Sequence, residues 1–166
     1  MEADKIKNRA RNNAYALLRQ RPQSEFEIRR RLKLKGYGGD VIEGVIEDLR
    51  RAGEVDDGKF ARLWVDSRMH SNPMGDVVLR HELKQKGVAD SIIEATLEDK
   101  AKNYDEYEVA FSMAKEQYAR LKKLDRRKAL KRIYDFLLRR GFKYDTIRKI
   151  TDELIGLGKE DELPED

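Results

Sequence analysis

The segment IRRRLKLKG, residues 28–36, decides the fold, because two apolar residues four positions apart are followed after four more by a glycine. A spacing of four places Ile28 and Leu32 on the same face of a helix. Gly36 can adopt the left-handed conformation that closes a helix, and Lys35 before it suits the negative end of the helix dipole. The segment therefore predicts the C-terminal end of an amphipathic helix that exposes basic residues.

The same pattern occurs twice more along the chain, at Leu79-Leu83-Gly87 and at Ile133-Leu137-Gly141. The glycines at 36, 87 and 141 stand 51 and 54 residues apart, a period typical of helical repeats. A second apolar-periodic stretch follows each glycine, and a third precedes each pattern. Each unit is therefore expected to hold three helices. The stretch after each glycine contains an isoleucine six residues on, at Ile42, Ile93 and Ile147.

We predict an all-α fold, an elongated array of three tandem three-helix repeats with about nine helices. No stretch shows the alternating pattern of a strand, so a sheet is not expected. The expected boundaries are a flexible N-terminus at 1–7, repeats at 8–53, 54–102 and 103–156, and an acidic flexible tail at 157–166. Capping-box spacings predict three of the helix starts, at Ser24 with Glu27, Asp40 with Glu43, and Ser91 with Glu94.

The composition indicates a basic body with an acidic end. The chain has 166 residues, of which 39% are hydrophobic and 41% charged, and its net charge is +4. The nine residues from Gly158 to Asp166 hold one lysine and five acids, so residues 1–157 carry 35 basic and 27 acidic groups, or +8. An anionic partner such as nucleic acid is one interpretation, and solubility is the other.

Two clusters of basic residues are the candidate binding surfaces. The first surrounds Ile28 and Leu32, where two basic ridges flank the apolar stripe and are expected to meet phosphates or an acidic protein groove. The second is the densest basic stretch of the chain. Solvated faces with no partner remain the alternative for each single residue. The candidates are Arg29, Arg30, Arg31, Lys33 and Lys35 in the first cluster, and Lys122, Lys123, Arg126, Arg127, Lys131, Arg139 and Arg140 in the second.

The sequence offers no group of residues suited to catalysis, a metal or a cofactor. The chain has no cysteine, which excludes disulfides, thiolate nucleophiles and the usual structural zinc sites. Asp56 and Asp57 precede a predicted helix, so capping explains the pair better than metal binding. His70 and His81 lack a recognisable set of further ligands, and no glycine-rich phosphate loop is present. We therefore expect no enzyme activity, no metal and no cofactor.

The aromatic residues and the hydropathy of the chain indicate no further binding role. Phe26 and Phe136 fall on apolar periodicities, which predicts packing rather than stacking on bases. No signal region and no window of about 18 apolar residues is present, which predicts a cytoplasmic protein with no membrane contact.

Four motifs in the right order resemble the RecX family of bacterial regulatory proteins, over about residues 8–155. The first is Arg21-x-x-Ser24-x-x-Glu27-Ile28-x-x-Arg31-Leu32-x-x-Lys35-Gly36, and the next is Gly53-Glu-Val-Asp56-Asp57-x-x-Phe60-Ala61. The other two are Gly75-x-x-x-Leu79-x-x-Glu82-Leu83-x-x-Lys86-Gly87-Val88 and Ile133-x-x-Phe136-Leu137-x-Arg139-Arg140-Gly141-Phe142. The two ends of the chain have no counterpart in the family's pattern.

The resemblance implies a modulator of the recombinase RecA, inhibitory in most members. It implies binding to RecA filaments on single-stranded DNA, or to RecA monomers, and suppression of ATP hydrolysis, strand exchange and repressor cleavage in recombination and DNA repair. We expect a monomer, and contact with duplex DNA stays open. The alternative is an independent DNA-binding protein, because paired helices joined by a glycine turn resemble helix-turn-helix units.

Overall fold

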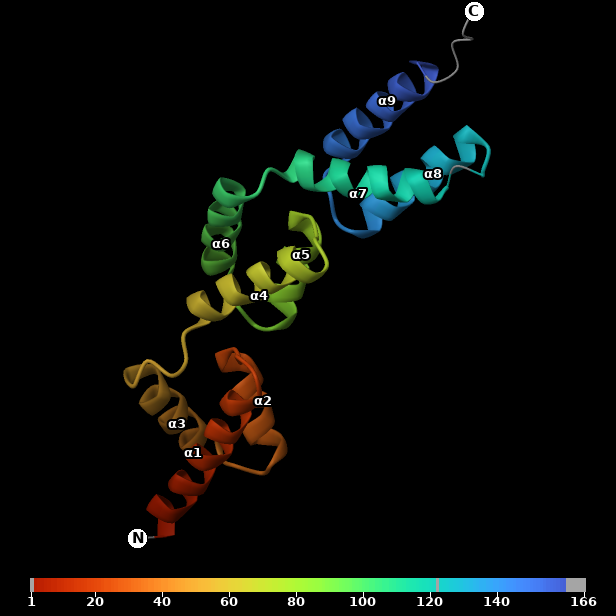
Figure 1. Cartoon of the computed structure of the whole chain (residues 1–166). Helices are drawn as coiled ribbons and strands as arrows, with labels where there is room; N and C mark the ends of the chain where they lie inside the picture. The colour runs from red at the N-terminus through yellow and green to blue at the C-terminus, as the bar shows by residue number, and fades with distance from the viewer. Residues whose placement is uncertain (1, 122, 161–166) are drawn as a thin grey trace, which may run out of the picture. The chain divides into compact units, whose positions relative to one another are not determined.

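The computed structural model describes residues 2–121 and 123–160, and within them the chain forms helices and no strand. The all-α class and the three-helix repeats are confirmed. Figure 1 shows the helices in chain order. They are α1 (Glu2–Gln20), α2 (Glu25–Leu34), α3 (Gly39–Arg51), α4 (Asp57–Ser71), α5 (Asp76–Gln85), α6 (Asp90–Asn103), α7 (Glu106–Arg120), α8 (Arg126–Arg139) and α9 (Tyr144–Glu160).

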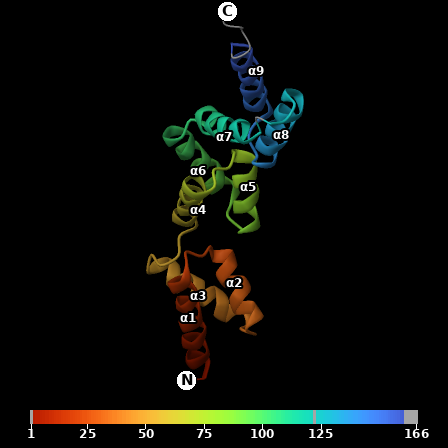
Figure 2. The same ribbon diagram turned by 45° about the vertical axis from the view of Figure 1, so that its right-hand side comes forward.

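The chain divides into two compact units whose boundaries pass through α4, α5 and α6. The first unit comprises the residues up to 67 together with 81–96, and the second comprises 68–80 together with the residues from 97 onward. Figures 1 and 2 show α1, α2 and α3 grouped in the first unit, and α7, α8 and α9 grouped in the second. Each group of three helices encloses an apolar core.

The two cores include the apolar residues that define the repeat pattern. Ile28 and Leu32 are fully buried in the first core, and Ile133 and Leu137 occupy the matching places in the second. Small residues of α1 and α7 let these helices approach the others closely. The first core contains Ala10, Ala14, Ile28, Leu32, Ile42, Val45, Ile46, Leu49 and Val55. The second contains Ala110, Ala114, Ile133, Leu137, Phe142, Ile147, Ile150 and Leu154.

The glycine that ends each repeat pattern has the predicted left-handed conformation. The φ angles are 85° at Gly36, 72° at Gly87 and 79° at Gly141. In the first repeat the amide of Tyr37 donates to the carbonyl of Leu32, so a terminal carbonyl of α2 is satisfied within the chain.

One of the three predicted capping boxes is confirmed and two are wrong. The Ser24 hydroxyl accepts from the amide of Glu27 at 3.2 Å, and the Glu27 carboxylate accepts from the amide of Ser24 at 3.2 Å. By contrast, α3 begins at Gly39 after an N-cap glycine, which places Asp40 inside its first turn. Likewise α6 begins at Asp90, which places Ser91 inside its first turn. The acids Asp40 and Asp90, in the first turns of these helices, interact favourably with the positive end of the dipole instead.

The helices extend beyond the predicted boundaries at both ends of the array. The segment 1–7 was predicted to be flexible, but α1 begins at Glu2, and Lys7 forms an ion pair of 2.7 Å with Asp48 of α3. Glu2 in the first turn also favours the helix dipole. At the other end α9 reaches Glu160, past the predicted end of the third repeat at 156, and residues 161–166 of the predicted tail lie outside the described residues.

Candidate binding surfaces

In the first unit the N-terminus of α2 is joined to the end of α5. The Ser24 hydroxyl donates to the carbonyl of Lys86 at 2.6 Å, and the Lys86 ammonium pairs with Glu27 at 3.1 Å. The same ammonium lies 4.0 Å from the ring centre of Trp64. A Cβ added to Gly87 would lie 2.3 Å from the Cβ of Phe26, so only glycine allows this approach. The junction fixes the position of the basic helix α2.

In the second unit the N-terminus of α5 meets the end of α8 in a similar contact. The amide of Gly75 donates to the carbonyl of Arg140 at 2.8 Å, and the amide of Val77 donates to the carbonyl of Gly141 at 3.3 Å. The Arg140 guanidinium donates to the side chain of Asn72 and, at 3.2 Å, to the carbonyl of Pro73. Arg140, a predicted binding residue, therefore also has a structural role.

Arg29 belongs to an ion-pair cluster and is the least available of the predicted basic residues on α2. Its guanidinium donates to Glu25 at 2.9 Å and to Glu43 at 2.8 Å, and Glu25 also accepts from Arg50 at 2.8 Å. The hydrogen bond to Glu43 is the main reason why the pKa of Arg29 is raised. The hydrogen bond from Arg50, followed by that from Arg29, lowers the pKa of Glu25. Because two carboxylates already neutralise the charge of Arg29, its guanidinium is less available to an anionic ligand.

This cluster predicts a loss of stability in acid. Glu25 and Glu43 have lowered pKa values in the folded state, so the stability they add is present above the unfolded pKa of about 4.3 and is lost as pH falls through their folded values. The melting temperature of the protein should therefore fall between pH 7 and pH 3. Glu43→Gln should lower stability at pH 7 and reduce the further loss in acid. An equal loss for both proteins across this pH range would contradict the role of Glu43.

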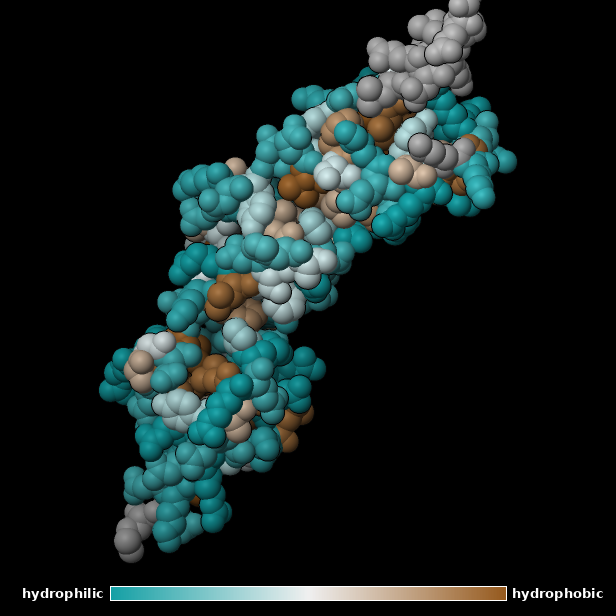
Figure 3. Space-filling model, viewed as in Figure 1, coloured by the Kyte–Doolittle hydropathy of each residue, from teal (hydrophilic) through white to brown (hydrophobic). Residues whose placement is uncertain are grey.

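The other four basic residues of the first cluster are exposed: Arg30, Arg31, Lys33 and Lys35. Within the described part of the chain, none of them forms an ion pair. Hydrophilic side chains cover most of the face drawn in Figure 3, and brown apolar areas are confined to patches. Two apolar side chains are exposed on α2 beside the basic ones, Phe26 at 44% and Leu34 at 73%. Phe26, predicted to be packed, covers Gly87 with one side and leaves the other accessible.

A pocket of about 520 Å³ lies beside these exposed residues. Arg30 and Lys33 line it together with the apolar side chains of Phe26 and Ile42 and the ring of Tyr37. The hydroxyl of Tyr37 accepts from the side-chain Nδ2 of Asn13 at 2.7 Å, which fixes the ring. The first basic surface therefore combines free cations with an apolar pocket, which suits a polyanion or an acidic protein segment.

The second cluster is divided by the structure. Lys122 lies outside the described residues. Arg126 donates to the backbone carbonyl of Ile155 in α9, so it has a structural role. The exposed members are Lys123, Arg127, Lys131 and Arg139. None of these four forms an ion pair with a described residue. Because Ala129, Ile133 and Leu137 of α8 are buried, the opposite face of the helix presents cations to solvent.

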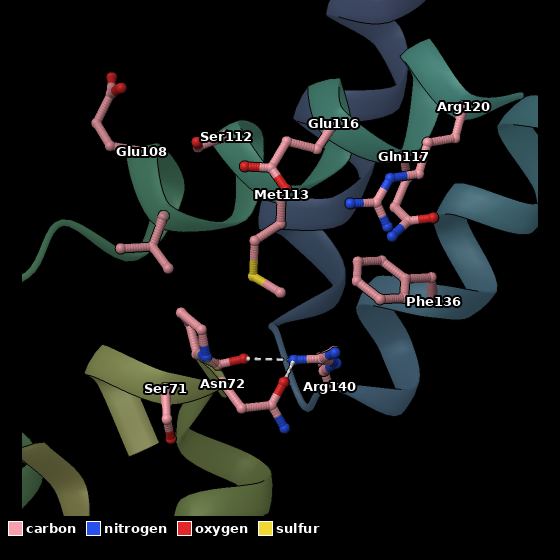
Figure 4. A pocket seen from close by; sticks show the side chains of 12 residues that line it. Ser71, Asn72, Glu108, Ser112, Met113, Glu116, Gln117, Arg120, Phe136 and Arg140 are labelled. Carbon is pink, nitrogen blue, oxygen red and sulfur yellow. Dashed lines mark hydrogen bonds between the residues drawn. The ribbon is translucent and has the colours of Figure 1, made fainter. Parts of the chain in front are cut away.

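A second pocket, of about 580 Å³, opens between the end of α4, the length of α7 and the end of α8. Figure 4 shows Met113 and the guanidinium of Arg120 directed into it, with Phe136 and Arg140 on the α8 side and Glu108 directed away. Phe136 was predicted to be packed, but one side of its ring lines this pocket, and the Arg140 guanidinium lies 5.0 Å from the ring centre. Burial lowers the pKa of Arg140. Sequence reasoning missed Arg120, because residues 105–121 carry no distinctive motif.

The two adjacent aspartates act as helix caps rather than as a metal site. Asp56 accepts from the amide of Lys59 at 2.9 Å, as predicted, whereas Asp57 accepts from the amide of Glu25 at the start of α2, also at 2.9 Å. Burial raises the pKa of Asp57. Among the side chains that the structure describes, no group of three or more histidine, aspartate or glutamate residues is placed to hold a metal ion. No helix in these ranges has the length and apolar character needed to cross a membrane.

Comparison with known proteins agrees with this architecture. Residues 10–49, 56–97 and 104–151 match the family models of the first, second and third three-helix domains of RecX. The chain is 37% identical over 153 residues to the regulatory protein RecX of Prosthecochloris aestuarii, an alignment that covers 92% of this chain and 98% of that one. It is 34% identical to the RecX of Pelodictyon phaeoclathratiforme over 91% and 92% of the two chains. The crystal structure of RecX from Lactobacillus salivarius superposes with a TM-score of 0.79 at 25% identity, covering 91% and 97%.

Proposed function

The chain belongs to the RecX family of regulatory proteins, and on that premise we propose that it binds filaments of the recombinase RecA on single-stranded DNA. Binding reduces the ATP hydrolysis, strand exchange and co-protease activity of the filament in recombination and DNA repair. The protein acts by contact alone, as a cytoplasmic monomer without enzyme activity, because the nucleotide and its chemistry belong to the recombinase.

The observation that carries this proposal is the pair of exposed cationic surfaces on α2 and α8. On α2 and its C-cap these cations are Arg30, Arg31, Lys33 and Lys35, and on α8 they are Arg127, Lys128, Lys131, Arg132 and Arg139. None of them forms an ion pair with a described residue, so their charge is available to phosphates and carboxylates. A filament of protein on DNA offers both kinds of anion. The basic surfaces on separate repeats support contact with an extended, repeating partner rather than with a small ligand.

Binding to three targets tests the proposal. Labelled protein is added to RecA filaments assembled on single-stranded DNA with a slowly hydrolysed ATP analogue, to the same DNA alone, and to RecA alone. We expect the tightest binding to the filament. Equal binding to the filament and to bare DNA would contradict a filament-directed function.

Salt dependence tests whether phosphate contacts contribute. A protein that neutralises several phosphates releases their counterions, so its affinity falls steeply as salt rises. We expect the affinity for single-stranded DNA to fall by about tenfold or more between 50 and 200 mM salt, since several phosphate contacts give a slope of this order. A flat response, measured by fluorescence anisotropy, would argue against the basic surfaces as the DNA contacts.

The structure argues against an independent helix-turn-helix function. In such proteins the helix after the turn enters the major groove. Here the helix after the first turn is α3, which carries Asp40, Glu43, Glu47 and Asp48. The cations of this helix, Arg50 and Arg51, are already paired with carboxylates, so α3 offers little positive charge to the phosphates of a duplex. The exposed cations lie on α2, before the turn, which disfavours this way of docking.

A further inference from the structure

We propose that the pocket lined by Arg120, Phe136 and Arg140 in the second unit binds one nucleotide of a single-stranded nucleic acid, with its base on Phe136 and its phosphate at the two arginines. This inference rests on the proposed function and deepens it, because it names a residue-level contact for the DNA. The pocket belongs to the second unit, whereas the predicted cluster on α2 belongs to the first.

The pocket separates an apolar floor from a cationic side. Met113 and Phe136 provide the floor, and base stacking on an aromatic ring is the usual way in which proteins hold single strands. Arg120 is exposed and forms no ion pair with a described residue. Arg140 uses one nitrogen of its guanidinium for Asn72 and Pro73, and has no carboxylate partner in the described part of the chain. The pocket thus holds two guanidinium groups whose charge is not balanced by a bound acid.

A row of basic side chains on α8 ends at this pocket and can bind the backbone of a single-stranded nucleic acid. Lys128, Arg132, Phe136 and Arg140 stand four residues apart and so form one ridge of the helix, with a rise of about 6 Å between neighbours. Lys128 and Arg132 are exposed and form no ion pair with a described residue. A backbone following this ridge meets two cations before its next base reaches the ring of Phe136.

The acids on the rim favour a base over an acidic peptide. Glu108 and Glu116, both on α7, line the pocket on the side away from Arg140. Both carboxylates would repel acidic side chains. Because Glu108 is directed away from the pocket, only the carboxylate of Glu116 is placed to accept a hydrogen bond from an N–H group of a base. In a duplex the base is stacked and paired, and extracting it costs a few kcal/mol. A single strand is therefore the occupant that fits the charges and the floor.

The test compares oligothymidylate with an abasic strand of the same length, in the absence of RecA, by fluorescence anisotropy. We expect the protein to bind oligothymidylate about tenfold more tightly, a difference of the order that one stacked base provides. Phe136→Leu should remove this difference and leave the affinity for the abasic strand unchanged. Arg120→Ala should weaken binding of both strands by about fivefold more than Lys149→Ala, which removes an equal charge from an exposed residue outside the pocket.

Equal affinity of the parent protein for the two strands would overturn the inference, and so would a base preference that survives in Phe136→Leu. Because Phe136→Leu can also disturb packing, the affinity of Arg120→Ala for DNA is measured as a second test, since Arg120 is exposed and its substitution does not disturb the core. If Arg120→Ala weakens binding to RecA filaments but not to DNA, the pocket receives a segment of the recombinase and the inference is wrong. If the protein prefers the strand with bases but has no effect on RecA, the proposed function is wrong and the nucleotide pocket still stands.

Discussion

Gly141→Ala is expected to cost about 2–5 kcal/mol of unfolding free energy, the sum of left-handed backbone strain and overpacking. Gly141 has a φ of +79°, and an added Cβ would lie 2.6 Å from the amide nitrogen of Val78 and 2.7 Å from its Cγ2. The nitrogen is a backbone atom and cannot move without shifting α5. The substitution should therefore open the junction of α5 with α8, and urea unfolding measures the loss.

Gly36→Ala is the matched control for this prediction. Gly36 also ends a helix with a positive φ, +85°, but no atom lies within 4 Å of the place that its Cβ would take. It should lose only the cost of the left-handed conformation, about 1–2 kcal/mol. If the two variants unfold at the same urea concentration, the close packing around Gly141 adds nothing to the free energy of unfolding, which would contradict this prediction.

Reversing the four free cations of α2 is expected to weaken binding to RecA filaments by at least about 100-fold, or about 0.7 kcal/mol for each charge. The variant combines Arg30→Glu, Arg31→Glu, Lys33→Glu and Lys35→Glu. Arg29 is left unchanged because it holds Glu25 and Glu43, so its reversal would confuse a folding defect with a binding defect. Circular dichroism checks that the variant stays helical.

A second fourfold reversal controls for the change in net charge. Lys5, Arg9, Arg19 and Lys149 are exposed, form no ion pair with a described residue and lie outside the proposed surfaces. Their reversal to glutamate changes the charge of the protein by the same amount. We expect a loss of less than about tenfold, since long-range electrostatics alone are screened at physiological salt. Equal losses in the two variants would show that binding depends on net charge and not on the α2 surface.

The sequence was sufficient for features that depend on neighbouring residues. The spacing of Ile28, Leu32 and Gly36 predicted the buried face and the left-handed end of α2, because both are set within a few turns of one helix. The starts of α3 and α6 lie two residues before the predicted ones, since a polar side chain such as Asp40 or Ser91 gives nearly the same pattern at the N-cap and in the first turn.

Features that depend on tertiary contacts could not be predicted from the sequence. Arg29 looked equivalent to Arg30 and Arg31, but its partner Glu43 lies 14 residues away on α3. Arg140 meets Asn72 across 68 residues of sequence, and the pocket beside it exists only because the end of α4 packs near α7 and α8. The sequence showed where basic residues are concentrated. Only the fold showed which of them form ion pairs with carboxylates and which do not.

Whether the protein acts on RecA filaments can be measured by the rate of single-stranded-DNA-dependent ATP hydrolysis by RecA from the same organism. The protein is added either before or after filament assembly, at amounts from far below one per RecA monomer up to equality. We expect inhibition of assembled filaments at amounts well below one per RecA monomer. Inhibition only near equal amounts, or no change in rate in either order of addition, would contradict action on the filament.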